Sequence, residues 1–146
     1  KHRGKKLCHR MGSAVNGLEP LKFQRAGDGP PLFLVHGYLA GSAIWADQLE
    51  AFAKQFDVIA VDLPGFGASS EIESHASLEA IAAHILETLS HMGVETFHLL
   101  GHSMGGMVVQ QMTLDAPERI QKLVCYGTGP VGVLPGRFET LEDRRG

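Results

Sequence analysis

The residues best suited to chemistry lie in one short segment, Gly101–Gly106, which reads Gly-His-Ser-Met-Gly-Gly. It matches the pattern G-x-S-x-G, in which a serine stands on a tight turn between a strand and a helix. Gly101 and Gly105 carry no Cβ atom, so the turn can close and leave the hydroxyl of Ser103 exposed. The first N–H groups of the next helix favour negative charge there. The segment predicts nucleophilic catalysis by Ser103, and the alternative is a serine that only caps the helix.

A second segment, His36-Gly37-Tyr38, follows an apolar run directly. An oxyanion is stabilised by two converging N–H donors, one after the nucleophile and one from a loop after a neighbouring strand. The backbone N–H groups of Met104 and Tyr38 are the candidates, and Gly37 supports the loop. We expect His36 to make a structural hydrogen bond rather than to act as a base. His102 adjoins the serine, and because neighbouring side chains diverge, we expect it to be structural or to line the pocket.

A third polar segment, residues 62–69, follows another apolar run and reads Asp-Leu-Pro-Gly-Phe-Gly-Ala-Ser. Asp62 is a candidate catalytic carboxylate. We favour a bracing role, in which the side chain accepts hydrogen bonds from backbone N–H groups of the turn that follows it.

The sequence has no H-E-x-x-H, C-x-x-C or P-loop pattern, so we expect no metal and no cofactor. His84, Glu87 and His91 share one face of an expected helix, opposite its apolar stripe. We interpret this face as a solvated surface, because a metal site there would need a further ligand.

The composition limits the classes of protein to consider. With 146 residues, 44% hydrophobic and 20% charged, the chain fits a soluble globular domain. A net charge of −3 gives no reason to expect nucleic-acid binding, and no run approaches the ~18 apolar residues that span a membrane. Cys8 and Cys125 make no disulfide framework, so a reduced, cytoplasmic setting is the default expectation. Cys125 lies in an apolar run and is expected to be buried.

Strand-like and helix-like segments alternate along the chain. Ser42 and Ser77 are expected to cap the first two helices, Gly93 to end the second, and Pro117 to stop a third that follows Ser103. In the first helix, one face would carry Trp45, Leu49, Phe52 and Phe56. Strands are expected at residues 21–25, 32–35, 58–61, 97–100 and 120–126. This alternation predicts a three-layer α/β fold with a mainly parallel sheet.

Three regions are expected. Residues 1–17 form a basic, disordered tail; binding of a polyanion, or extraneous sequence before Met11, are the alternatives. Residues 18–130 form the α/β core. Residues 131–146 begin a cap or lid, or are a non-native tail.

Taken together, the segments 36–38, 62–69 and 101–106 resemble those of the α/β-hydrolase superfamily in kind and order. The resemblance covers roughly residues 20 to 130 and implies that Ser103 is the nucleophile and that Tyr38 and Met104 are the oxyanion donors. It also implies that Gly127 begins the segment that leads to a cap. Members that open epoxides or remove halides resemble this sequence elsewhere but carry Asp in place of Ser103. A serine favours acyl transfer on a small molecule: hydrolysis of an ester, lactone, thioester or amide, C–C cleavage beside a ketone, or perhydrolysis.

A serine needs a base, and the base needs an orienting acid. In this fold they follow in the order Ser, Asp or Glu, His, yet the last histidine is His102 and residues 127–130 hold no carboxylate. The fold is therefore expected to be incomplete, with its C-terminal strands missing, and the chain inactive alone. Two alternatives remain: a non-catalytic module that binds a small ligand, and a half-domain completed by a partner chain or by self-association through the exposed sheet edge.

Overall fold

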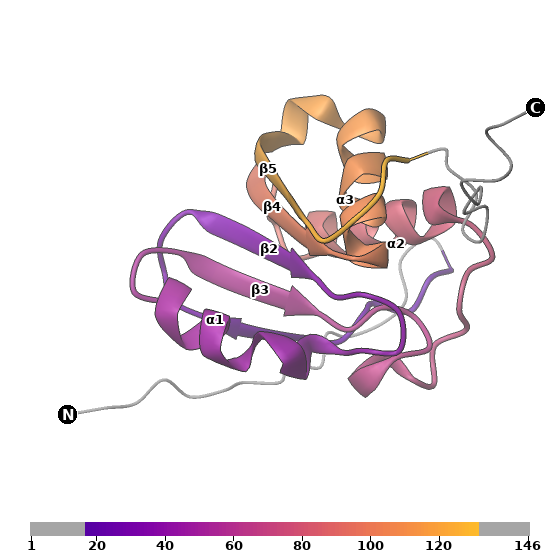
Figure 1. Cartoon of the computed structure of the whole chain (residues 1–146), viewed down its shortest axis with the longest axis horizontal. Coiled ribbons are helices and arrows are strands. Elements are labelled where there is room, and N and C mark those ends of the chain that lie inside the picture. Colours follow the sequence, from indigo (N-terminus) through magenta and orange to yellow (C-terminus); the bar gives the residue numbers. More distant parts are fainter. Residues whose placement is uncertain (1–16, 132–146) are drawn as a thin grey trace, which may run out of the picture.

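The computed structural model describes residues 17–131 as one twisted sheet with helices on both faces (Figure 1). The strand order is β1-β3-β2-β4-β5. The strands are β1 (Phe23–Ala26), β2 (Pro31–Val35), β3 (Asp57–Val61), β4 (Phe97–His102) and β5 (Ile120–Tyr126). The helices are α1 (Ala46–Phe52), α2 (Leu78–His91) and α3 (Met104–Asp115), with short 3-10 helices at Ser42–Trp45, Gly67–Ser69 and Pro117–Arg119. Only β1 runs antiparallel to its neighbour, so the predicted three-layer, mainly parallel α/β fold is confirmed.

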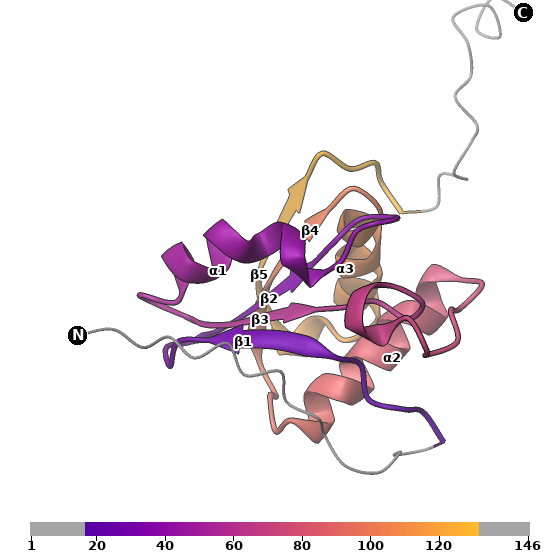
Figure 2. The ribbon, with the colours of Figure 1, turned by 90° about the horizontal axis from the view of Figure 1, so that it is seen from below.

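The two faces of the sheet pack against different helices (Figure 2), with α1 on one face and α2 and α3 on the other. Along β2, Phe33 and Val35 enter the core beneath α2 and α3. Leu32 and Leu34 alternate with them and enter the smaller core beneath α1. A strand buried on both faces needs apolar residues at every position, and this explains the continuous apolar run of β2.

The ends of α2 and α3 follow from local sequence. The Ser77 hydroxyl accepts a hydrogen bond from the Ala80 N–H at 3.2 Å and caps α2 as predicted. Gly93 follows α2 with φ 74°, a left-handed conformation that glycine adopts freely. α3 ends two residues before Pro117, which also agrees with the sequence.

Three sequence predictions about elements were wrong in detail. The first strand begins at Phe23 rather than Leu21. The N-cap of α1 is Trp45 rather than Ser42, which begins a preceding 3-10 turn and whose side chain bonds to Asp62. Phe56 lies beyond the last residue of α1, although it still packs against the core on that face.

The prediction that Cys125 is buried was also wrong, because its side chain is exposed. β5 is the edge strand of the sheet: Ile120 packs against the core, but every later residue of the strand is exposed. Leu123, Val124 and Tyr126 are 38%, 50% and 66% exposed. An apolar run thus indicates a strand here without indicating burial.

Both ends of the sequence fall outside the described residues. The basic tail predicted over residues 1–17 lies there, apart from Gly17, as does Cys8. The cap or non-native tail predicted over residues 131–146 lies there too, apart from Val131. Within residues 17–131, no helix has the length and apolar character needed to cross a membrane.

Candidate active site

Ser103 stands at the junction of β4 and α3 in an uncommon backbone conformation, with φ 56° and ψ −122°. Non-glycine residues rarely adopt positive φ, because Cβ crowds the backbone. The Ser103 N–H donates to the carbonyl of Tyr126 at 3.1 Å, which ties the turn to the end of β5. The side chain is exposed at the carboxyl edge of the sheet, as the sequence pattern predicts for a nucleophile.

The glycines on either side of Ser103 sit where no side chain fits. A Cβ on Gly101 would lie 2.3 Å from the carbonyl oxygen of Gly105. A Cβ on Gly105 would lie 2.3 Å from the carbonyl oxygen of Val35 and 2.4 Å from that of His36. The first α3 turn therefore packs directly on the end of β2, which fixes where the serine stands.

The loop after β2 lies against the serine. A Cβ on Gly37 would be 3.0 Å from the Cβ and 3.5 Å from the Oγ of Ser103. The structure thus brings together the two segments that carry the predicted oxyanion donors, Tyr38 and Met104.

His36 is fully buried and joins two loops. Its Nδ1 lies 2.7 Å from the Gly37 carbonyl oxygen, and its Nε2 accepts the Leu63 N–H at 3.0 Å. Burial lowers the pKa of His36, so the ring is neutral, and the bond from Leu63 assigns the proton to Nδ1. His36 then donates to Gly37, and both nitrogens are engaged, which leaves neither free to accept a proton from the serine.

The hydrogen bond from His36 also orients an amide. In a trans peptide the C=O and N–H groups point in opposite directions. Fixing the Gly37 carbonyl towards the buried ring therefore directs the Tyr38 N–H away from it. The Ala40 N–H donates to the same carbonyl at 3.3 Å and holds the loop in this arrangement.

Asp62 braces a different loop from the one predicted. Its buried carboxylate accepts from the Ser42 N–H at 2.7 Å and from the Ser42 hydroxyl at 3.0 Å. Ser42 lies in the segment between β2 and α1, and Asp62 and Leu63 follow β3. The Asp62–Ser42 bonds and the Leu63–His36 bond therefore connect the loops after β2 and β3. Gly67 approaches closely enough that a Cβ there would lie 2.1 Å from the carboxylate. The Asp62 carboxylate is therefore engaged in structural hydrogen bonds to Ser42.

His102 is half-buried, and its ring meets that of Tyr126 at 5.4 Å between centroids. The side chain lies beside the end of β5, where a Cβ on Gly127 would lie 3.5 Å from its Nε2. The structural or pocket-lining role expected for His102 from the sequence stays a prediction.

Aromatic side chains surround the loop after β2. The ring of Tyr38, 67% exposed, meets the edge of Phe66 at 5.7 Å, and Phe66 also contacts His36 at 5.8 Å. Leu39 is 78% exposed and adopts φ 58°, the second positive φ of a non-glycine residue in residues 17–131. The loop whose Gly37 lies against Ser103 thus carries exposed apolar side chains.

Thr128 was not singled out by the sequence. Its hydroxyl donates to the Ser103 carbonyl at 2.6 Å from the loop that follows β5. Nothing in the local sequence signals this contact, since it depends on the pairing of β5 with β4.

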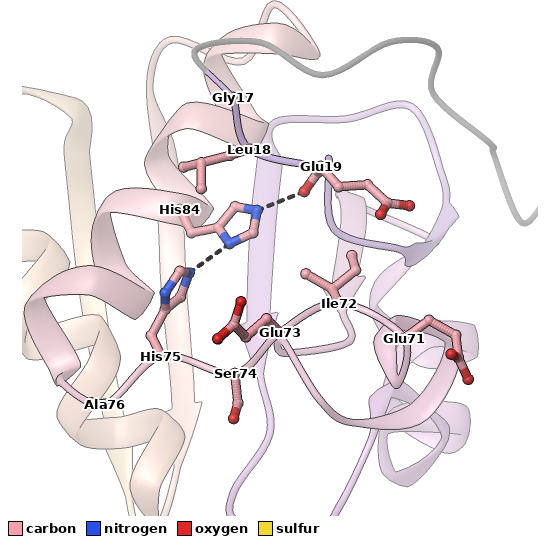
Figure 3. Close-up of a pocket in the computed structure, with 10 residues that line it drawn as sticks. All are labelled: Gly17, Leu18, Glu19, Glu71, Ile72, Glu73, Ser74, His75, Ala76 and His84. Carbon is pink, nitrogen blue, oxygen red and sulfur yellow. Dashed lines mark hydrogen bonds between the residues drawn. The ribbon is translucent and has the colours of Figure 1, made fainter.

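A separate cavity of about 510 Å³ lies between the segment before β1 and the loop that precedes α2, and His84 of α2 also lines it (Figure 3). None of the predicted site residues lines it. There His84 Nε2 lies 2.6 Å from the Glu19 carbonyl oxygen, and Nδ1 lies 2.9 Å from His75 Nε2. The prediction of a solvated face was therefore wrong for His84, which is buried because residues 18–20 cover it. No group of three potential metal ligands occurs within residues 17–131.

Comparison with known proteins identifies relatives. The sequence pattern described as "alpha/beta hydrolase fold" matches residues 30–144. The chain is 39% identical over 111 residues to a pimeloyl-[acyl-carrier protein] methyl ester esterase of Vibrio campbellii, covering 75% of this chain and 41% of the relative. It is 34% identical over 121 residues to a fluoroacetate dehalogenase of a Burkholderia species, covering 80% and 39%.

A solved structure shows the same arrangement. The crystal structure of a hydrolase from Pseudomonas aeruginosa PA01 matches with a TM-score of 0.70 and 34% identity, covering 74% of this chain and 42% of that one. The chain thus spans about two fifths of the length of these proteins.

Proposed function

This chain belongs to the alpha/beta hydrolase fold family, and we propose that it carries the nucleophile half of a serine hydrolase site that acts on an acyl substrate. The observation that carries the proposal is the backbone of Ser103, held at φ 56° between two glycines that admit no Cβ. A serine that only capped a helix would not need this conformation.

The reaction would begin with attack by the Ser103 Oγ on the acyl carbonyl carbon. The carbonyl electron pair moves to oxygen, and the N–H groups of Tyr38 and Met104 stabilise the oxyanion. A base outside the described residues takes the hydroxyl proton and returns it to the leaving alcohol or thiol as the tetrahedral intermediate collapses. Water then attacks the acyl-enzyme, so that a carboxylic acid is released and the serine recovers its proton.

The residue types also favour acyl chemistry within the family. The relatives include both an esterase and a dehalogenase, and in family members that remove halides the nucleophile is an aspartate. Ser103 cannot form an ester intermediate by carboxylate attack, as that chemistry requires. The apolar surface of Tyr38, Leu39 and Phe66 suits an acyl chain or another apolar substituent beside the reacting carbonyl.

The test is hydrolysis of p-nitrophenyl butyrate by the 146-residue chain, and by the same chain extended with whatever coding sequence follows it in its gene. We expect negligible turnover from the first, and turnover from an extension that contains an in-frame Asp and His. Ser103→Ala should abolish it, while Ser70→Ala, an exposed serine after β3, serves as the matched control. Turnover that survives Ser103→Ala would contradict the proposal.

A second candidate, a half-domain completed by another chain, is favoured by the exposed apolar side chains of β5. An unpaired strand edge with apolar side chains binds another strand or associates. In that case the missing strands, acid and base would come from a partner, and mixing the two chains would restore turnover that neither shows alone. Binding of a small ligand that is unchanged by Ser103→Ala would instead favour a non-catalytic module.

A further inference from the structure

We infer that Thr128 is a positioning residue, which holds and polarises the peptide between Ser103 and Met104 so that the Met104 N–H acts as an oxyanion donor. The inference rests on the proposed function, since it assigns a role within the same site. Thr128 lies outside the G-x-S-x-G pattern.

The first observation is the hydrogen bond itself. The Thr128 hydroxyl lies 2.6 Å from the Ser103 carbonyl oxygen and 3.3 Å from that of Gly129. A hydroxyl has one proton, and the shorter distance lies at the strong end of the range for O–H···O bonds. The proton is therefore assigned to Ser103. The Gly106 N–H donates to the same oxygen at 2.9 Å, so both lone pairs are used.

The second step is the geometry of the peptide. The bond between Ser103 and Met104 is trans, so its N–H points opposite to the carbonyl that Thr128 anchors. This N–H belongs to the first turn of α3, where N–H groups lack partners within the helix. A hydrogen bond to a peptide carbonyl also strengthens the N–H of that peptide as a donor. Thr128 thereby both aims and strengthens the donor.

The other donor is held in the same way. His36 donates to the Gly37 carbonyl at 2.7 Å, and the N–H of that peptide belongs to Tyr38. Each oxyanion peptide is thus anchored through its carbonyl by one side chain and one backbone N–H. The side chains come from different parts of the sheet, His36 from the end of β2 and Thr128 from the loop after β5.

Gly106 supplies an independent observation. The pattern G-x-S-x-G does not require a glycine at this position. A Cβ on Gly106 would lie 2.5 Å from the Cβ of Thr128 and 2.6 Å from its hydroxyl oxygen. Glycine at position 106 therefore leaves room for the Thr128 side chain against the first turn of α3. This contact explains why a residue with a side chain would not fit there.

The experiment compares Thr128→Val, which keeps the shape and removes the hydroxyl, with Thr128→Ser, which keeps the hydroxyl. Thr113→Val is the matched control, because the Thr113 hydroxyl also donates to a carbonyl in α3, that of Val109 at 2.8 Å. In the form that hydrolyses p-nitrophenyl butyrate, we expect Thr128→Val to lower kcat about tenfold with KM little changed. Thr128→Ser should restore most of the rate, and Thr113→Val should leave it unchanged.

A second readout does not depend on turnover. In the 146-residue chain, the carbonyl 13C resonance of Ser103 and the amide 15N resonance of Met104 should move upfield in Thr128→Val, because the carbonyl loses a donor. Both should return towards their original positions in Thr128→Ser. Gly106→Ala, which displaces Thr128, should shift the same two resonances in the same direction as Thr128→Val.

The outcomes separate this inference from the proposed function. Turnover that is lost in Ser103→Ala but unchanged in Thr128→Val would overturn the role of Thr128 and leave the serine hydrolase standing. Unmoved Ser103 and Met104 resonances in Thr128→Val would overturn the hydrogen bond on which the inference is built. Turnover that survives Ser103→Ala would overturn the proposed function, and with it the catalytic role of Thr128.

Discussion

Ser103 combines an exposed hydroxyl with a backbone conformation that other residues avoid. Its φ of 56° and ψ of −122° place it in a region where a Cβ atom is crowded. Such strain is of order 1–3 kcal/mol and persists only where the surroundings enforce it. Here they do, through the hydrogen bond from the Ser103 N–H to Tyr126 and the close packing of Gly105 on β2. These contacts hold the hydroxyl in its exposed position at the carboxyl edge of the sheet.

Replacing Ser103 by glycine should therefore stabilise the chain. Glycine accepts this conformation, so about 1–3 kcal/mol of strain is released, against about 0.5–1 kcal/mol for the extra freedom of glycine in the unfolded chain. A net gain of about 1 kcal/mol in the free energy of unfolding is expected in urea denaturation. Ser70→Gly, at a right-handed φ of −59°, is the matched control and should lose about 0.5–1 kcal/mol. A Ser103→Gly variant as unstable as Ser70→Gly would show that the turn stores no strain.

The sequence allows part of the candidate site to be predicted, but not all of its contacts. Ser103 and its flanking glycines could be predicted because the turn imposes a steric requirement that is written locally in the sequence. The contacts of Thr128 and Asp62 could not, because each joins segments far apart in the chain, to Ser103 and Ser42 respectively. Such contacts depend on which distant segments the fold brings together, and a local sequence pattern does not contain that information.

At the scale of elements, α3 is positioned by its first turn. Gly105 lies on the carbonyl groups at the end of β2, so at this point the backbone of the helix contacts the backbone of the strand directly. The contact sets the distance between the two loops that carry the candidate oxyanion donors. The packing of one helix on one strand thus determines the geometry of the site.

Gly105→Ala should separate α3 from β2. The added Cβ would lie 2.3 Å from the Val35 carbonyl oxygen, and backbone cannot move aside cheaply, so a loss of about 3 kcal/mol in the free energy of unfolding is expected. Denaturant unfolding followed by circular dichroism measures it. Gly129→Ala is the matched control, because a Cβ there meets nothing within 4 Å. Equal stability of the two variants would contradict the close packing.

The contact between α2 and the segment before β1 should respond to pH. Burial lowers the pKa of His84, so the unfolded chain binds the proton more readily than the folded one. Stability is then complete above the unfolded pKa of about 6.5 and falls as pH decreases towards the folded value. Burial lowers the pKa of His36 as well, and its contribution has the same sign.

His84→Gln isolates one of these two contributions. Glutamine keeps a donor for the Glu19 carbonyl but does not titrate, so the free energy of unfolding should decrease less steeply between pH 7 and pH 5 than in the original chain. His91→Gln, at an exposed histidine in the last turn of the same helix, is the matched control for the substitution itself. An unchanged slope in His84→Gln would show that His84 is not buried in a neutral form.

At the scale of the whole molecule, the alternation of strand and helix signals predicted the sheet well. The parallel core could be predicted from the sequence because β2 is apolar throughout and β3 is apolar from Val58 to Val61, as burial on both faces demands. The exposure of β5 could not, since its sequence is equally apolar at Leu123 to Cys125. That sequence is suited to a covered strand, and the chain spans only about two fifths of its relatives.

The exposed edge should therefore make the chain associate. Apolar side chains on an unpaired strand favour contact with a second copy when nothing else covers them. Sedimentation velocity over a concentration series should show dimers or larger species that Val124→Lys reduces, because a charge on the edge strand opposes pairing. Leu114→Lys is the matched control: Leu114 is 68% exposed, but on α3 rather than on the edge strand, and should leave association unchanged. A chain that stays monomeric throughout the series would show that the exposed side chains of β5 do not drive association. The argument for completion by a partner chain would then lose its physical basis.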